Sequence, residues 1–182
     1  MIKGDLVELK PADPDLSGWI IRELNNMEQT KHQNKGIIPI TIQQEIKYIN
    51  KMNDSSTDVL FHIYNNTLVG SISLNNINWI HRSAEIGVMI FKDHQGKGYG
   101  KEAVGLIDYY AFNILNLHRI WAECFIENMA MNEIFRYFSF IREGTITDVY
   151  FKNGKYNDVY IWNKHWQNVK GNLESTIEGE SK

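Results

Sequence analysis

The chain has 182 residues, 43% hydrophobic and 23% charged, a balance that excludes a disordered chain and favours one folded domain. Its formal net charge of −3 gives no electrostatic reason to expect nucleic-acid binding, and its one cysteine excludes a disulfide framework. No apolar run is long enough to cross a membrane, and the first residues do not resemble a signal peptide, so we expect a cytoplasmic protein without a membrane partner. We expect a single domain over residues 1–166 and a polar tail at 167–182, where the hydrophobic periodicity stops.

The first third of the chain is predicted to hold one strand and two helices. Residues 6–10 have the β-rich pattern of a strand and are followed by a proline. Residues 15–28 are predicted to form a short helix with Asp15 or Ser17 as its N-cap. Residues 41–52 are predicted to form a second helix, because they begin with the threonine-to-glutamine spacing of a capping box.

The middle of the chain changes to the two-residue period of β-strands. Residues 58–64 and 67–75 are β-rich and are joined by two asparagines, which predicts a hairpin. In a third strand, at 82–91, alternate residues are apolar and share one face. Helical periodicity then returns over residues 98–115.

The last third is predicted to hold a strand, a helix and a hairpin. The strand covers residues 118–125, and the helix follows Asn128. The hairpin pairs residues 145–152 with 155–162 through an Asn-Gly dipeptide, the strongest short hairpin signal in the chain. The resulting order, β-α-α-β-β-β-α-β-α-β-β, indicates an α/β domain with a mixed sheet.

A glycine-rich segment at 94–101, with the sequence HQGKGYGK, lies between a predicted strand and the long helix. Glycines at alternate positions allow tight turns and let several N–H groups point into one concavity. The unpaired amides and the positive dipole end of the following helix add to this site. A pyrophosphate needs many such donors at short range, so we expect this segment to bind one.

Two common phosphate-binding motifs do not fit this segment. A P-loop requires serine or threonine after its lysine, but Lys97 is followed by Gly98. The dinucleotide fingerprint requires glycine at the position where this chain has Lys101. Nucleotide binding through the segment is therefore an alternative that lacks its usual motif.

The pattern Gln-Gly-x-Gly-x-Gly at 95–100 resembles the pyrophosphate-binding motif of the GNAT superfamily of acetyl-CoA-dependent N-acetyltransferases. Residues 82–87 resemble the strand that leads into that motif, and residues 127–140 resemble the family's second cofactor segment. The sequence at 151–158 is similar to the terminal hairpin of the branch that contains ribosomal-protein and spermidine acetyltransferases. The likeness covers about residues 6–166.

The resemblance implies an α/β fold with a mixed sheet of about six to seven strands, a splayed central parallel pair and about four helices. Acetyl-CoA would bind as a cosubstrate between the splayed strands, with its pantetheine lying like an added strand. The histidines and the single cysteine show no metal-ligand spacing, so the sequence itself predicts no metal. The implied cofactor-binding residues are Val88, Met89, Ile90, Gln95, Gly96, Gly98, Tyr99, Gly100, Lys101, Asn128 and Phe135.

Direct transfer of an acetyl group to an amine needs a base, a polarised carbonyl and a thiolate that can leave. An alkyl ammonium has a pKa near 10, so a carboxylate base helps at neutral pH, and Glu85 is our candidate. The backbone N–H of Ile90 is our candidate for polarising the thioester carbonyl. Where the family often has a tyrosine that protonates the thiolate, this chain has Phe135, and losing that acid costs up to about 10²-fold.

Each of these assignments has a structural alternative. Asn128 has the position of a helix N-cap, Glu85 could serve as an ion-pair partner, and Phe135 fits an apolar core stripe. Because of Phe135, a non-catalytic acyl-CoA-binding module is the competing function. The expected acceptor is a protein N-terminal amine or a small polyamine, with an amino-sugar nucleotide as a third alternative. It would enter over the N-terminal helices and the loop at 34–39, and the hairpin also implies a homodimer.

Overall fold

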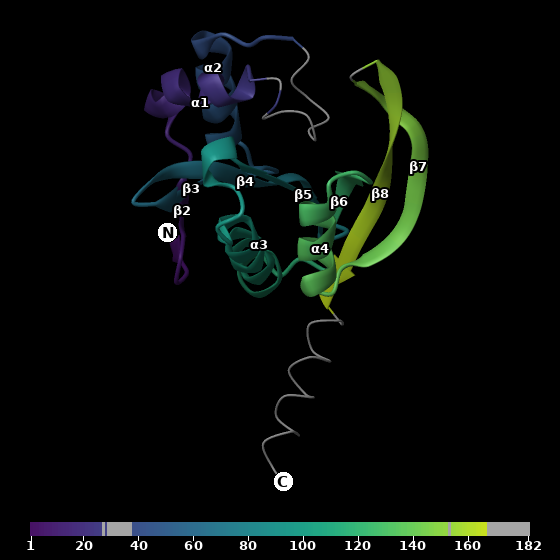
Figure 1. Ribbon diagram of the computed structural model, residues 1–182. Helices are drawn as coiled ribbons and strands as arrows, with labels where there is room; N and C mark the ends of the chain where they lie inside the picture. The colour runs from purple at the N-terminus through teal and green to yellow at the C-terminus, as the bar shows by residue number, and fades with distance from the viewer. Residues whose placement is uncertain (27, 29–37, 153, 167–182) are drawn as a thin grey trace.

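The structure is a computed structural model that describes residues 1–26, 28, 38–152 and 154–166 (Figure 1). Most of the predicted acceptor loop and the predicted tail at 167–182 lie outside these residues. The described residues contain one eight-stranded sheet with helices on both faces.

The strands include the seven predicted from the sequence and one more, a two-residue strand at the N-terminus that is too short to show a period. Their bounds are β1 (Ile2–Lys3), β2 (Glu8–Pro11), β3 (Val59–Asn65), β4 (Thr67–Asn78), β5 (Ser83–Ile90), β6 (Arg119–Phe125), β7 (Ile141–Lys152) and β8 (Lys155–His165). The spatial order is β1-β2-β3-β4-β5-β6-β8-β7. Among these described strands every neighbouring pair is antiparallel except β5 and β6. The mixed sheet with a central parallel pair is therefore confirmed.

In the part of the chain that the structure describes, four α-helices cover the sheet, two on each face (Figure 1). Their bounds are α1 (Ser17–Leu24), α2 (Ile42–Asn53), α3 (Tyr99–Tyr109) and α4 (Met129–Tyr137). The first pair lies over one face and the second pair over the other. The β7–β8 hairpin extends beyond α4 at the end of the sheet.

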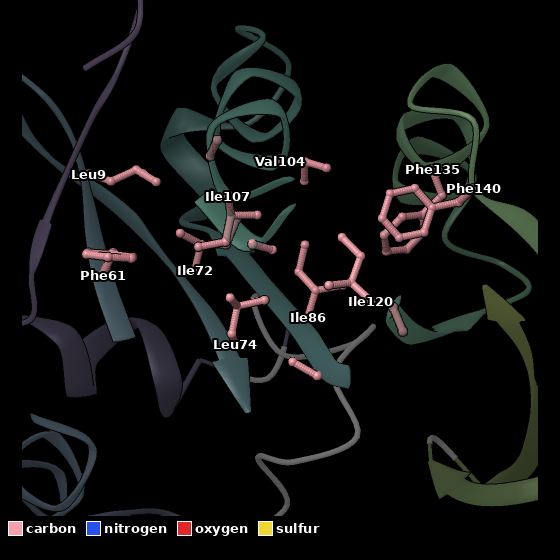
Figure 2. Close-up of a cluster of buried hydrophobic side chains, with 14 of the residues drawn as sticks. Leu9, Phe61, Ile72, Leu74, Ile86, Val104, Ile107, Ile120, Phe135 and Phe140 are labelled. Atoms are coloured by element: carbon pink, nitrogen blue, oxygen red, sulfur yellow. The ribbon is translucent and has the colours of Figure 1, made fainter. Parts of the chain in front are cut away.

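The main core fills the space between the sheet and α3 and α4 (Figure 2). Alternate strand residues such as Ile72 and Ile86 meet Val104 and Ile107 of α3, and all four are almost fully buried. Each such side chain contributes roughly 1.5–3 kcal/mol through burial. Because alternation sends the apolar side chains of β5 to this face, the intervening residues of the strand must face α1 and α2.

Local signals explain where the helices begin. The predicted capping box is present, since the Thr41 hydroxyl accepts from the Gln44 amide and the Gln44 side chain accepts from the Thr41 amide. The predicted cap of the first helix was wrong. Asp13 accepts from the Asp15 amide at 2.9 Å and caps a short 3-10 turn, which then continues into α1 at Ser17.

Candidate active site

A cleft of about 740 Å³ lies beside α1 and α2, on their face of the sheet. It extends to the place where β5 and β6 separate. It brings together residues from helices and strands that are distant in the sequence, including Glu85, Val88 and Phe135. Three of the predicted site residues thus line one cavity, and Met89 and Asn128 line it as well.

The gap between β5 and β6 opens because their pairing is short. The two strands pair at Ser83 with Arg119, at Ala84 with Ile120 and at Glu85 with Trp121, and no further. Beyond that point β5 stays paired with β4 and β6 stays paired with β8. The parallel strands therefore diverge toward their C-terminal ends, as a splayed pair is expected to do.

The direction of the backbone groups determines which residues of β5 face this gap. The Phe91 amide donates to the Val69 carbonyl at 2.9 Å, so odd-numbered residues of β5 direct their backbone groups toward β4. A Cβ at Gly70 of β4 would lie 2.2 Å from the Met89 carbonyl oxygen, in agreement with this direction. The backbone groups of Val88 and Ile90 consequently face β6, whereas Met89 reaches the cleft through its side chain.

The glycine-rich loop connects β5 to α3. Gly96 has a φ of 75° and Gly98 a φ of 85°, a left-handed conformation that favours glycine. Gly98 is the N-cap of α3 and provides no side-chain cap, so the first-turn amides, at Tyr99, Gly100 and Lys101, have no partner within the helix.

Two predicted loop residues make contacts of their own. The Gln95 side-chain amide donates to the Ile90 carbonyl at 2.9 Å, which ties the loop to the end of β5. The Lys101 ammonium lies 3.3 Å from the centre of the Tyr137 ring. An elongated thiol cofactor with a pyrophosphate fits these features, because the uncapped helix start can hold the phosphates and the opening strands can pair with amides.

Polar side chains form the floor of the cleft beside Glu85. On β4, Ser73 pairs in register with Gly87, and Asn75 pairs with Glu85. The Asn75 side chain donates to the Ser73 hydroxyl at 3.0 Å. A Cβ at Gly87 would lie 3.0 Å from that hydroxyl, so the absence of a side chain keeps this part of the floor open.

Among the charged side chains that line the cleft, acidic groups outnumber basic ones. The carboxyl groups that line it among the described residues are Glu45, Asp58, Glu85 and Glu123. Burial raises the pKa of Glu45, which is 6% exposed. Burial alone would also raise the pKa of Asp58, but hydrogen bonds from the Asn76 amide and from two hydroxyls lower it.

A buried histidine, His62 of β3, lies in the same floor. Burial lowers its pKa to about 4, and its Nδ1 accepts from the Asp13 amide at 3.2 Å. At neutral pH it is therefore uncharged, which leaves Lys51 as the one cationic side chain among the described residues lining the cleft.

On the other side of the cleft, Asn128 caps α4. Its side chain accepts from the Met131 amide at 3.2 Å, so the capping interpretation is confirmed and a cofactor contact remains a prediction. Phe135 is 2% exposed and packs against Phe140 and Trp162, while still lining the cleft. It is thus both a core residue and part of the cavity wall.

Several residues at or near the site carry no sequence motif. Asn132 is fully buried, donates to the Phe125 and Ile126 carbonyls and accepts from the Trp162 indole. The Tyr150 hydroxyl donates to Glu123 at 2.5 Å inside the cleft. The Glu102 carboxylate, one turn into α3, accepts from three successive amides of the loop after β1. These contacts join segments far apart in sequence, which single-sequence periodicity does not indicate.

The resemblance to the GNAT acetyltransferases implies a splayed parallel pair of strands. It also implies that a glycine loop and a helix without a side-chain cap follow this pair. A family model described as an acetyltransferase (GNAT) domain matches residues 6–140. The chain belongs to this family.

Individual relatives support this assignment. The chain is 39% identical over 92 residues to spermidine N(1)-acetyltransferase from Vibrio cholerae, a match that spans about half of either protein (50% and 53%). The crystal structure of spermidine N-acetyltransferase from Vibrio cholerae in complex with CoA and spermine superimposes with a TM-score of 0.83, at 26% identity, covering 90% of this chain and 98% of that one. A dodecameric structure of the Vibrio cholerae enzyme superimposes with a TM-score of 0.78 at 25% identity, covering 91% and 97%.

Other chemistry finds little support in the described residues. Within them, no group of three or more His, Cys, Asp or Glu side chains could hold a metal ion. Burial raises the pKa of the Cys124 thiol to about 12, so this cysteine is unsuited to nucleophilic catalysis. No helix in the described part of the chain is long and apolar enough to cross a membrane.

Proposed function

We propose that the chain is an acetyl-CoA-dependent N-acetyltransferase that acts on a primary amine. Acetyl-CoA supplies the acetyl group as a thioester. The observation that carries the proposal is the early end of the β5–β6 pairing directly before the glycine loop. This juxtaposition gives room for pantetheine between the strands and amides for the pyrophosphate at the start of α3.

In this proposal the site residues divide the work of cofactor binding and proton transfer. The first-turn amides of α3 and the glycine loop hold the phosphates, and the backbone of Val88 and Ile90 positions the pantetheine. The Ile90 amide polarises the thioester carbonyl. Glu85, on the acceptor face of β5, takes the proton from the incoming ammonium so that the free amine can attack.

We propose a small polyamine as the acceptor, in preference to a protein N-terminus or an amino-sugar nucleotide. Carboxyl groups outnumber cations on the cleft wall, which favours a ligand with several positive charges and disfavours a nucleotide. The likeness to a spermidine acetyltransferase that was crystallised with CoA and spermine supports the same choice. The sequence arguments also favour a cytoplasmic location for the reaction.

The test is release of free thiol from acetyl-CoA with spermidine, an N-terminal peptide and an amino-sugar nucleotide as separate acceptors. Turnover is expected to be highest with spermidine. CoA binding without turnover on any amine would instead indicate the non-catalytic module. ATP or NAD protecting the protein against heat better than CoA would contradict the cofactor assignment itself.

We further propose that copies of the chain associate through the β7–β8 hairpin. β7 is the edge strand of the sheet, and the hairpin exposes large apolar side chains, namely Ile141, Ile146, Phe151 and Tyr156. Such an edge is a surface for pairing with another chain, and a related enzyme forms a dodecamer. Light scattering of the wild type and of Phe151→Lys tests this, because the charged variant is expected to have the lower mass.

A further inference from the structure

We infer that Glu123 of β6, held in position by Tyr150 of β7, binds the ammonium group of the acceptor beside the thioester. Tyr150 is then a positioning residue that acts through Glu123. The inference rests on the proposed function, because it needs an amine acceptor in the cleft. It adds a contact from β6 to that acceptor, across the gap from Glu85 on β5.

The strand register places Glu123 on the acceptor face. Trp121 is the register partner of Glu85, and side chains of register partners lie on the same face of a sheet. Two residues further along β6, Glu123 lies on that face again, at the point where the strands separate. The two carboxylates consequently flank the opening at a Cα separation of at least roughly 8 Å, the value for strands that are still paired.

Both carboxylates line the same cleft, with no bulky side chain of β5 between them. Had the pairing continued, the residue facing Glu123 would be Gly87, which has no side chain. A Cβ there would contact the Ser73 hydroxyl at 3.0 Å. An ammonium group that enters over β4 thus meets short polar side chains below it and a carboxylate on each side.

Tyr150 reaches Glu123 because β7 is irregular at this point. Between Ile146 and Tyr150 the register with β8 shifts, and Asp148 has a φ of 52° with its amide bonded to the Asp158 side chain at 2.9 Å. After the bulge the Tyr150 hydroxyl donates to Glu123 at 2.5 Å, and its ring lies 5.5 Å from that of Phe125.

This arrangement gives the two carboxylates different tasks. A primary ammonium has three N–H donors, and Glu85 removes one proton from it while Glu123 accepts from another. No bond at Glu123 is formed or broken, so it contributes to acceptor binding. The hydrogen bond from Tyr150 fixes one carboxylate oxygen and thereby limits the directions in which Glu123 can bind the amine.

The test measures KM for spermidine and for acetyl-CoA in Glu123→Gln, Tyr150→Phe and the double variant. Glu123→Gln is expected to raise KM for spermidine about 10- to 100-fold, the worth of a hydrogen bond to a charged group. KM for acetyl-CoA stays unchanged. Tyr150→Phe raises KM for spermidine by a smaller factor and adds nothing in the double variant.

Matched controls are Glu143→Gln, which removes a carboxylate of β7 that pairs with Arg119, and Tyr109→Phe, at an exposed tyrosine of α3. Both are expected to behave as wild type. An unchanged KM for spermidine in Glu123→Gln overturns the inference while leaving the acetyltransferase proposal intact. Full additivity in the double variant overturns the positioning role of Tyr150.

Calorimetry distinguishes a failure of this inference from a failure of the proposed function. If the wild type acetylates no amine, spermidine is titrated into CoA-saturated wild type and into Glu123→Gln. Binding that is lost in the variant supports the ammonium site without any turnover. Equal binding to both proteins, or no binding to either, overturns it.

Discussion

The proposed cofactor side of the cleft relies largely on backbone groups, whereas the proposed acceptor side relies on side chains. In this proposal, backbone groups of β5 and of the glycine loop, where Gly96 and Gly98 have a positive φ, bind the cofactor. Across the split, the lining includes titratable and hydroxyl side chains from five strands, among them Glu85, Glu123 and Ser73. Backbone recognition depends on local conformation, and side-chain recognition depends on long-range pairing, so the two sides should respond differently to substitution.

The largest effect is expected on the cofactor side. Gly98→Val places a β-branched side chain at a φ of 85°, which strains the loop and displaces the first amides of α3. CoA affinity measured by calorimetry should fall by at least about 100-fold, because hydrogen bonds to charged phosphates are lost. Gly144→Val, at an open position on β7, is the matched control. Unchanged affinity in Gly98→Val would refute the pyrophosphate assignment.

A loss of similar size but of another kind is expected on the acceptor side. Glu85→Gln removes the proposed base, and kcat should fall by about 10²- to 10⁴-fold. CoA affinity should remain that of the wild type, because the Glu85 side chain lies on the other face of β5 from the core and the cofactor contacts are backbone. A weakened CoA affinity with normal kcat would show that the two sides are not separate.

Lowering the pH should reduce the stability of the folded protein through His62, a titratable side chain that is buried on the acceptor side. The pKa of His62 is about 4 in the folded state against 6.5 ordinarily, so the unfolded chain takes up the proton first as the pH falls. The free energy of unfolding should drop by roughly 2 kcal/mol from pH 7 to pH 5 through this group. Urea unfolding should show a smaller drop in His62→Gln. An identical drop in both proteins would contradict the assignment of this pH dependence to His62.

The smallest expected change concerns the boundary between the two sides. Phe135→Tyr introduces a hydroxyl on the cleft wall, where the family often has a tyrosine. Protonation of the leaving thiolate should raise kcat by about tenfold, below the usual range of about 10²- to 10⁴-fold, because a thiolate whose thiol pKa is near 8.5 already leaves without an acid. Phe138→Tyr is a control on the same helix end. An unchanged kcat would indicate that the thiolate leaves without help or has another proton source.

The same contrast explains what the sequence could predict. The glycine spacing, the alternation of β5 and the capping box at Thr41 are local, and they predicted the loop, the strand and the start of the helix. The split pair was implied by the resemblance to the acetyltransferase family and by no local pattern. The Tyr150–Glu123 bond could not be predicted, because it depends on a bulge in β7 and on which strands β6 lies between. The backbone direction of Met89 needed the register with β4, which no pattern in β5 alone supplies.

The most direct measurement is residue-resolved amide hydrogen exchange of the protein with and without CoA. Addition of CoA is expected to slow exchange at the amides of Val88 and of the first turn of α3, and to leave that of Met89, whose backbone faces β4, unchanged. Slower exchange confined to other segments, with Val88 and the start of α3 unaffected, would contradict a cofactor held in the split between β5 and β6.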